Sequence, residues 1–349
     1  MNILLIQLKR IGDLILTTPA IAALRTKFPD AKLTLAISQE CAALVPALTD
    51  VDQILVMQRG LRDAGKFFAV LRQKFEYCVD FTRNDRSAAL AFLSGAKTRI
   101  VSYRVKRRTR IRRHAYNEFV EHRMRDMHTI DYALSLIEPL SVKDPSPVLH
   151  LNLPAEAQAK AGALRQQAKI DNRFIIFHPG SARLEKFWEP ERWAEVLEHA
   201  RTKWQIDCVL TGGGSALEQK HLARIKAQLR PNPDRTSHTD VATGSVIDLS
   251  GKTDLLTLGA LIAQARLLVT VDSAPLHLAA ATHTPQVALF GPTNPFHWRP
   301  RESPALILQG ESGVPLQEFA PREPRLPMKQ ISTRAVIDAM DSLLSIPTM

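Results

Sequence analysis

The chain has 349 residues, with 46 Lys and Arg against 35 Asp and Glu, which gives a formal net charge of +11. Apolar residues make up 45% and charged residues 23%, a balance that is typical of globular proteins and excludes wholesale disorder, and the length favours two domains. The excess positive charge predicts an acidic partner, which could be a nucleic acid, an anionic membrane surface or a phosphorylated substrate.

The three cysteines, Cys41, Cys78 and Cys208, stand far apart, and no pair of them has the spacing of metal ligands. An odd number is a poor disulfide framework, so we expect a reducing, cytoplasmic compartment. Charged residues from Lys9 onward interrupt the first apolar run, and no later run has the length of a membrane span. We therefore expect a soluble chain that could still bind a membrane surface.

Short apolar runs alternate with longer amphipathic stretches through the first half of the chain. The expected strands are Ile3–Gln7, Leu33–Ile37, Ile54–Val56, Tyr77–Phe81 and Arg99–Val101. Helices are expected to begin near Asp13, Glu40, Leu61 and Asp85. Buried strands separated by helices predict a doubly wound, parallel α/β sheet.

The second half repeats this pattern without a visible sequence repeat. Its expected strands are Phe174–His178, Asp207–Thr211, Val246–Leu249, Leu267–Asp272 and Gln286–Phe290. Helices are expected to begin near Glu191, Ala216, Leu255 and Ala274, and a last helix is expected over Thr333–Leu344.

The stretch from Pro139 to Pro154 holds four prolines, which mark a connection, and a helix-like stretch, Ala155–Lys169, follows it. We expect a first domain over 1–153, a second domain over 154–325, and a C-terminal helical segment, 326–349, that could pack back on the first domain. Two such domains would face each other across a cleft at the carboxyl ends of their strands, where open α/β sheets bind ligands.

In each half of the chain, a polar motif follows the first strand. Gly12-Asp13 could place a general base at a strand end, although Asp is also a common helix cap. In the second half, His178-Pro179-Gly180-Ser181 is followed by Lys186, and such a loop could hold a diphosphate through amides, a hydroxyl and an ammonium group. An ordinary connection with a solvated lysine is the alternative.

Two further motifs follow later strands of the second half. Thr211-Gly212-Gly213-Gly214 would allow close approach by a nucleotide, and Glu218 could accept hydrogen bonds from a ribose; a flexible turn is equally consistent. Asp272-Ser273-Ala274-Pro275-Leu276-His277 would place amides at a helix N-terminus, which favours phosphate, although His277 could be an ordinary helix histidine.

The segment from Arg99 to Arg125 carries ten positive charges against only Glu118 and Glu121. This basic tract nearly accounts for the net charge, and it could bind nucleic acid, an anionic lipid or a phosphosugar, or be a solvated loop. Tyr103 and Tyr116 are too few to favour base stacking.

Taken in order, five motifs resemble glycosyltransferase family 9, the ADP-heptose:lipopolysaccharide heptosyltransferases. These are Gly12-Asp13 with Leu16-Thr17-Thr18-Pro19-Ala20, His178-Pro179-Gly180-Ser181 with Lys186 and Trp188, Leu249-Ser250-Gly251-Lys252-Thr253, Asp272-Ser273-Ala274-Pro275-Leu276-His277 and Phe290-Gly291-Pro292-Thr293. The Asp272 motif, with His297-Trp298-Arg299-Pro300 after it, is most similar to the third heptosyltransferase branch.

The resemblance implies a GT-B fold of two Rossmann-like domains, with the acceptor bound by the first (1–153) and the nucleotide sugar by the second (154–325). It also implies an inverting, metal-independent transfer of heptose from ADP-heptose to the lipopolysaccharide inner core. It implies that Asp13 is the catalytic base. The implied donor-binding residues are Ser181, Lys186, Glu218, Thr253, Asp272, Ser273, Ala274 and His277. Acceptor contacts are expected from Gly12, Arg104, Arg107, Arg108 and Arg110.

The expected partners are a nucleotide sugar, the lipopolysaccharide core acceptor and the anionic inner membrane surface, with no nucleic acid, no cofactor or metal, and a monomeric, cytoplasmic protein at the membrane periphery. Two other functions stay open: a sugar-nucleotide epimerase of similar fold, and a nucleic-acid-binding protein that uses the basic tract, residues 99–125.

Overall fold

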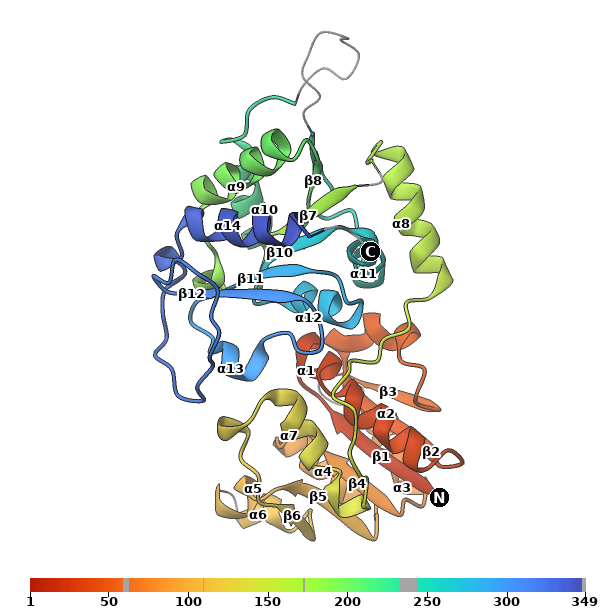
Figure 1. Cartoon of the computed structure of the whole chain (residues 1–349). Coiled ribbons are helices and arrows are strands. Elements are labelled where there is room, and N and C mark those ends of the chain that lie inside the picture. Colours follow the sequence, from red (N-terminus) through yellow and green to blue (C-terminus); the bar gives the residue numbers. More distant parts are fainter. Residues whose placement is uncertain (59–62, 109, 172, 233–243, 347–349) are drawn as a thin grey trace. The chain divides into compact units, whose positions relative to one another are not determined.

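The computed structural model describes residues 1–58, 63–108, 110–171, 173–232 and 244–346. They form two α/β units, Met1–Asn152 and Leu153–Met349, each built on one six-stranded parallel sheet (Figure 1). The doubly wound α/β class predicted from the sequence is therefore confirmed.

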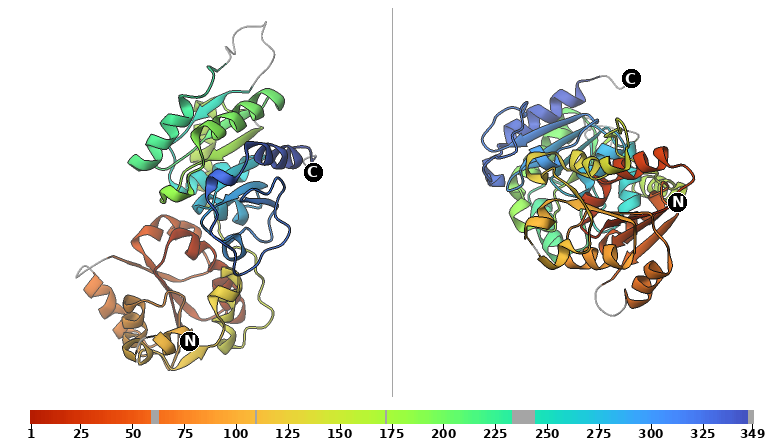
Figure 2. Two further views of the ribbon diagram at one scale, coloured as in Figure 1. Left: turned by 90° about the vertical axis from the view of Figure 1, so that its left-hand side faces the viewer. Right: turned by 90° about the horizontal axis from the view of Figure 1, so that it is seen from below.

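In the first unit the strands are short and mostly buried on both faces. In chain order they are β1 (Asn2–Gln7), β2 (Lys32–Ser38), β3 (Gln53–Met57), β4 (Tyr77–Asp80), β5 (Thr98–Ser102) and β6 (Glu118–Val120), and their order in the sheet is β3-β2-β1-β4-β5-β6. Ile3 to Ile6 in β1 have no exposed surface, because helices cover both faces of the sheet (Figure 2).

The helices of this unit include those expected near Asp13 and Asp85, and several more that the sequence pattern did not predict. They are α1 (Ile11–Ile15), α2 (Thr18–Lys27), α3 (Ala64–Arg72), α4 (Asp85–Leu93), α5 (Arg104–Arg108), α6 (Arg110–Arg113) and α7 (Thr129–Ser135). The expected start near Leu61 lies outside the described residues. The stretch near Glu40 forms a 3₁₀ helix, η1 (Gln39–Ala47), and Pro46 within it removes a hydrogen-bond donor.

The second unit repeats the architecture. Its strands are β7 (Phe174–His178), β8 (Asp207–Leu210), β9 (Val246–Asp248), β10 (Leu267–Val271), β11 (Gln286–Phe290) and β12 (Ala305–Gln309). Its helices are α8 (Ala155–Gln167), α9 (Pro190–Lys203), α10 (Ala216–Lys226), α11 (Leu255–Gln264), α12 (Ala274–Ala281), α13 (Pro295–Trp298) and α14 (Thr333–Leu344).

Both sheets have the same strand order once each is counted from its own first strand. The order in the second sheet is β12-β11-β10-β7-β8-β9, so its first strand, β7, lies between its second and fourth, just as β1 lies between β2 and β4. This is the order of dinucleotide-binding Rossmann folds, in which the order of successive strands reverses between the first and fourth strands. The carboxyl ends of β1 and β4, and of β7 and β10, are therefore where ligands are expected.

The C-terminal helix α14 does not follow the prediction that it could pack back on the first domain. Val336, Met340 and Leu344 are buried in the core of the second unit, and α14 contacts α9, β10, β11 and β12. The indole of Trp188 donates to the carbonyl of Ile331, just before α14, at 3.0 Å. The amphipathic pattern of α14 thus completes the second sheet's covering layer.

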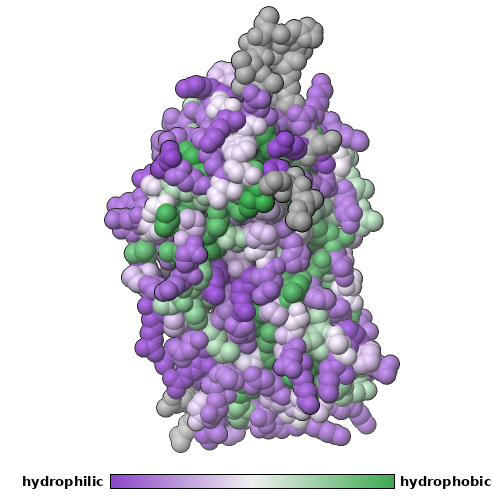
Figure 3. Space-filling view, viewed as in Figure 1, coloured by the Kyte–Doolittle hydropathy of each residue, from purple (hydrophilic) through white to green (hydrophobic). Residues whose placement is uncertain are grey.

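Within the described parts of the chain, no helix is both long enough and apolar enough to cross a membrane. Figure 3 shows hydrophilic residues over most of the face it presents, with apolar residues in smaller groups among them.

Candidate active site

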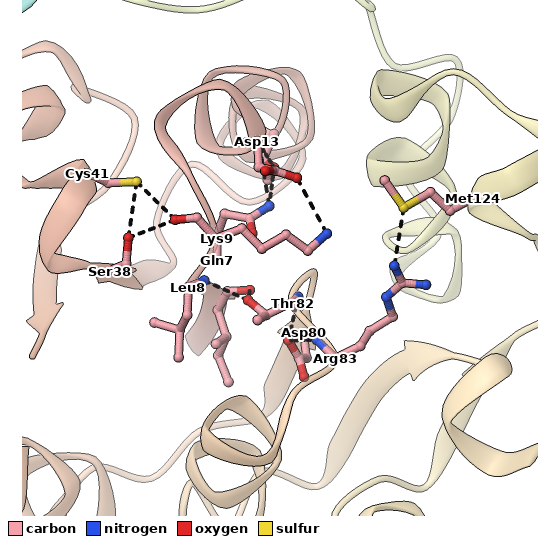
Figure 4. Close-up of polar contacts among 12 residues, drawn as sticks. Gln7, Leu8, Lys9, Asp13, Ser38, Cys41, Asp80, Thr82, Arg83 and Met124 are labelled. Carbon is pink, nitrogen blue, oxygen red and sulfur yellow. Dashed lines mark hydrogen bonds and ion pairs between the residues drawn. The ribbon is translucent and has the colours of Figure 1, made fainter. Parts of the chain in front are cut away.

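The first sequence motif lies at the carboxyl end of β1, at the reversal point of the first sheet. Helix α1 begins at Ile11 and its N-cap is Arg10, so Asp13 is not the helix cap that its residue type alone allowed. The side chain of Asp13 is 13% exposed, and one of its oxygens lies 3.5 Å from the ammonium of Lys9 (Figure 4). A mostly buried carboxylate just after a strand end can accept a proton from a bound hydroxyl.

Side chains of the motif also fix the backbone around Asp13. The hydroxyl of Thr17 donates to the Asp13 carbonyl at 2.7 Å, and the amide of Gln7 donates to that hydroxyl at 2.7 Å. Gly12 is half-buried inside α1, where its carbonyl accepts from the amide of Leu16 at 3.0 Å. The carboxylate is therefore carried by a turn that its own neighbours hold in place.

The neighbouring strand β4 ends in a buried carboxylate that the sequence did not single out. Asp80 accepts hydrogen bonds from the amides of Thr82 and Arg83, at 2.7 and 3.1 Å, and from the hydroxyl of Tyr116 at 2.5 Å. Burial raises the pKa of Asp80, and these donors oppose that effect. Thr82 in turn accepts from the amide of Leu8 at 2.6 Å, which ties the loops after β1 and β4 together.

Two arginines of the basic tract make contacts within the first unit. Arg99 donates to the carbonyls of Ala96 and Ala115, and Arg112 pairs with Asp85. Among the predicted acceptor contacts, Arg104 is exposed at the start of α5. The side chains of the other three predicted arginines lie outside the described part of the structure: Arg107, Arg108 and Arg110.

In the second unit, Lys186 joins two motifs that are far apart in the sequence. Its ammonium donates to the carboxylate of Asp272 at 2.6 Å and to the Asp272 carbonyl at 2.9 Å, and the two side chains are 12% and 8% exposed. Lys186 follows β7 and Asp272 follows β10, so the pair lies at the reversal point of the second sheet.

Next to this pair, helix α12 begins with its amides unopposed by a capping side chain. Ser273 is its N-cap residue but makes no capping hydrogen bond, and its buried hydroxyl has no partner among the described residues. Ala274 is the first helical residue and His277, 4% exposed, lies one turn along. A helix N-terminus with an unsatisfied hydroxyl and a nearby lysine fits the oxygens of a phosphate.

Glu218 brings the two glycine-bearing loops together. Ser215 caps α10 and its hydroxyl lies 2.9 Å from one Glu218 oxygen. The Glu218 carboxylate occupies the space that a Cβ atom would take at Gly180 and at Gly213, so a side chain at either position would displace it. The carboxylate thus lies over the backbone of both loops.

The remaining predicted donor residues lie on the loops around Glu218. Ser181 is 6% exposed and its hydroxyl accepts from the amide of Arg183 at 3.4 Å. Thr253 is half-buried in the loop between β9 and α11. The amide of Gly251 in that loop donates to the carbonyl of Gly212 at 2.9 Å, and Gly251 has φ +72°.

His178, at the end of β7, is a neutral structural group. Its Nδ1 lies 2.9 Å from the hydroxyl of Thr211, and burial lowers the pKa of His178 to about 4. Since an unfolded histidine titrates near 6.5, the unfolded chain binds a proton between pH 6.5 and 4 that the folded chain does not, so stability falls as the pH drops through this range.

We expect acidification from pH 6.5 to 4 to cost the wild-type protein about 3 kcal/mol of unfolding free energy at this site. Urea unfolding at both pH values measures this cost in the wild type and in His178→Asn, which should lose less stability on acidification. His283→Asn, at an exposed histidine, is the control and should lose as much unfolding free energy on acidification as wild type does. An equal loss of stability in all three proteins would contradict the assignment of this pH dependence to His178.

A cavity of the second unit and the three cysteines lie outside the set of predicted donor residues. A cavity of about 840 Å³ in the second unit is lined by Phe187, Trp188, His221 and Met328, among others, and by none of the predicted donor residues. The cysteines are buried and unpaired, and burial raises the pKa of Cys41 to about 11. Among the described residues, no three His, Cys, Asp or Glu side chains are grouped to hold a metal ion.

Comparisons with known proteins give matches over most of the chain. The model of glycosyltransferase family 9 (heptosyltransferase) matches residues 64–318. Lipopolysaccharide heptosyltransferase 3 of Escherichia coli is 25% identical over 299 residues, which are 83% of each chain.

Solved structures show the same fold. A family 9 glycosyl transferase from Veillonella parvula DSM 2008 has a TM-score of 0.81 at 24% identity, covering 98% of this chain and 97% of that one. The E. coli ADP-heptose lps heptosyltransferase II has a TM-score of 0.75 at 19% identity, covering 99% and 98%. The chain thus has the two-unit GT-B fold of these proteins.

Proposed function

The chain belongs to glycosyltransferase family 9, the heptosyltransferases, and from that premise we propose that it transfers heptose from ADP-heptose to a hydroxyl of the lipopolysaccharide inner core. The observation that carries the proposal is the pairing of Lys186 with Asp272 beside the unsatisfied hydroxyl of Ser273. These groups meet where a Rossmann-like sheet receives a nucleotide.

We propose that the diphosphate of the donor binds at Lys186 and the N-terminus of α12. The ammonium of Lys186 and the amides of Ser273 and Ala274 would offset its charge, and the hydroxyls of Ser181 and Ser273 would donate to its oxygens. Asp272 holds Lys186 in place, and His277 and Thr253 complete the donor contacts. In this proposal these groups stabilise the charge that develops on ADP as it leaves.

The ribose of the donor would bind at Glu218. A carboxylate held over Gly180 and Gly213 can accept hydrogen bonds from both ribose hydroxyls. We expect Glu218→Ala to weaken ADP binding about 10- to 100-fold, because hydrogen bonds to a charged group are lost. Calorimetric titration measures the affinity.

The control for this prediction is Glu191→Ala, which removes the same charge from an exposed position in the first turn of α9. It should leave the affinity within about twofold of wild type, since exposed ion pairs are worth little. ADP without its 2′- and 3′-hydroxyls should bind wild type and Glu218→Ala equally. Continued preference of Glu218→Ala for ordinary ADP would contradict a ribose contact.

We propose that Asp13 acts as the general base. Its carboxylate takes the proton of an acceptor hydroxyl while that oxygen bonds to the anomeric carbon of heptose, and the bond from this carbon to the diphosphate oxygen breaks on the opposite face. One proton and one sugar are transferred, ADP leaves, and the anomeric configuration inverts. In this proposal the acceptor binds at the first unit and the donor at the second.

Acceptor contacts are proposed for Gly12 and for the basic tract, Arg104 included, and we propose that the enzyme works as a monomer at the anionic membrane surface. Arg99 and Arg112 of the tract make internal contacts, which leaves fewer of its charges for a nucleic acid. An epimerase would instead isomerise the donor without an acceptor.

The overall test is donor profiling by mass spectrometry on a truncated lipopolysaccharide core. Offered ADP-heptose together with other nucleotide sugars, the enzyme should add one heptose and release one ADP. Isomerised donor in the absence of acceptor, or transfer of a different sugar, would contradict the proposed function.

A further inference from the structure

Arg83, directly after β4, has a backbone conformation that is unusual for its residue type. Its φ is +68°, a left-handed value that costs a non-glycine residue about 1 kcal/mol or more. The buried carboxylate of Asp80 enforces it by accepting the amides of Thr82 and Arg83. The fold therefore holds the Arg83 side chain in a direction that the relaxed backbone would not choose.

The guanidinium of Arg83 has no negative partner in the described part of the chain. Its Nη2 lies 3.2 Å from the sulfur of Met124, and its Cζ lies 5.1 Å from the ring centre of Tyr132. These contacts orient the group without neutralising it. By contrast, Arg86, three residues further on, is paired with the buried carboxylate of Asp63 at 2.9 Å.

A second cation, Lys9, lies next to Arg83 and Asp13. Its ammonium is 3.5 Å from Asp13, and Figure 4 shows it between the Asp13 carboxylate and the Arg83 guanidinium. Burial lowers the pKa of Lys9, the charge of Arg83 lowers it further, and Asp13 and Asp80 oppose this. Two partly buried cations thus lie close together, and the carboxylate of Asp80 is already occupied by Thr82, Arg83 and Tyr116.

We propose that Lys9 and Arg83 form a binding site for one anionic group of the acceptor, a carboxylate or a phosphate, beside the general base. Bound there, the anion would relieve the repulsion between the two cations and fix the acceptor so that its attacking hydroxyl faces Asp13. This inference rests on the proposed function, since it takes Asp13 as the base. It makes Arg83 a specificity-determining residue, and Lys9 a residue that binds the acceptor anion and positions the carboxylate of Asp13.

The test compares Arg83→Gly with wild type on three forms of a truncated lipopolysaccharide core: intact, carboxyl-reduced and dephosphorylated. Glycine adopts φ +68° without strain, so the variant should fold. On the intact acceptor its KM should rise about 10- to 100-fold, as expected for the loss of hydrogen bonds to a charged group, with kcat and ADP affinity little changed. For wild type, removing the anion that binds should raise KM by a similar factor, and Arg83→Gly should not respond to that removal.

The responding acceptor form identifies the anion as carboxylate or phosphate. Lys9→Gln should show the same loss of discrimination together with a lower kcat, because Lys9 also contacts Asp13. Lys74→Gln is the control: it removes an equal charge from an exposed position before β4 and should behave as wild type. Discrimination that persists in Arg83→Gly, or a KM that rises equally on all three acceptors, would overturn the proposal.

A binding measurement separates this proposal from the proposed function. Labelling of Lys9 by an amine-reactive reagent, followed by peptide mass spectrometry, should slow when inorganic phosphate or acetate replaces chloride at constant ionic strength. Arg83→Gly should lose this protection. If wild type transfers heptose to none of the acceptors, the proposed function fails, and protection of Lys9 still decides on the anion site: equal labelling in all three salts would overturn it.

Discussion

Replacing Asp13 with Asn should lower kcat for heptose transfer by roughly 10²- to 10⁴-fold, which is the usual contribution of a general base. Asn has the same shape and can still accept from Lys9, and the hydrogen bond from Thr17 goes to the backbone carbonyl, so the turn should keep its conformation. ADP affinity should stay within about twofold of wild type, because the predicted donor residues belong to the second unit. Initial rates of ADP release and calorimetric ADP titration measure the two quantities.

The matched control is Asp30→Asn, which removes one carboxylate from an exposed position of the same unit and should leave the rate unchanged. NMR of the anomeric centre tests the accompanying claim of inversion. Normal transfer by Asp13→Asn would remove Asp13 from the role of base, and a product with retained configuration would exclude the single displacement.

Local sequence patterns predict most of the secondary structure because each strand and helix carries its own signal. Helices α10, α11 and α12 begin where the sequence places them, after Ser215, Asp254 and Ser273, residues that favour helix starts. Two of the four edge strands, β6 and β12, were missed. β6 has three residues, of which only Val120 is buried, and β12 follows a proline-rich stretch that resembles a loop. The other two edge strands, β3 and β9, were predicted, so the two misses reflect these local features and not the edge position.

The motifs of the candidate site can be found in the sequence, but the sequence does not show which of them lie close together in space. Lys186 and Asp272 are 86 residues apart and come together because β10 crosses over to lie beside β7. Strand order depends on how the helices pack, which no local pattern reports. Arg83 was missed for the same reason, since its left-handed backbone depends on the burial of Asp80.

Replacing Lys186 with Ala should weaken ADP binding about 10- to 100-fold and slow transfer further, because a charge-assisted contact to the diphosphate is lost and the leaving group gains charge in the transition state. The same change leaves the carboxylate of Asp272, which is only 8% exposed, without its cation. A partner left alone in this way typically costs about 3–5 kcal/mol of stability, so reduced binding alone could reflect damage to the fold.

A second variant resolves this. Lys186→Met combined with Asp272→Asn removes both charges and should recover much of the unfolding free energy in urea that Lys186→Ala loses, since neutral groups of similar size replace a partly buried ion pair. It should not recover ADP affinity, because the ammonium is still absent. The loss of binding affinity from wild type to either variant should be smaller for AMP, which lacks the second phosphate, than for ADP. If the double variant regains both stability and ADP binding, Lys186 serves the fold through Asp272 and the diphosphate must be bound elsewhere in the second unit.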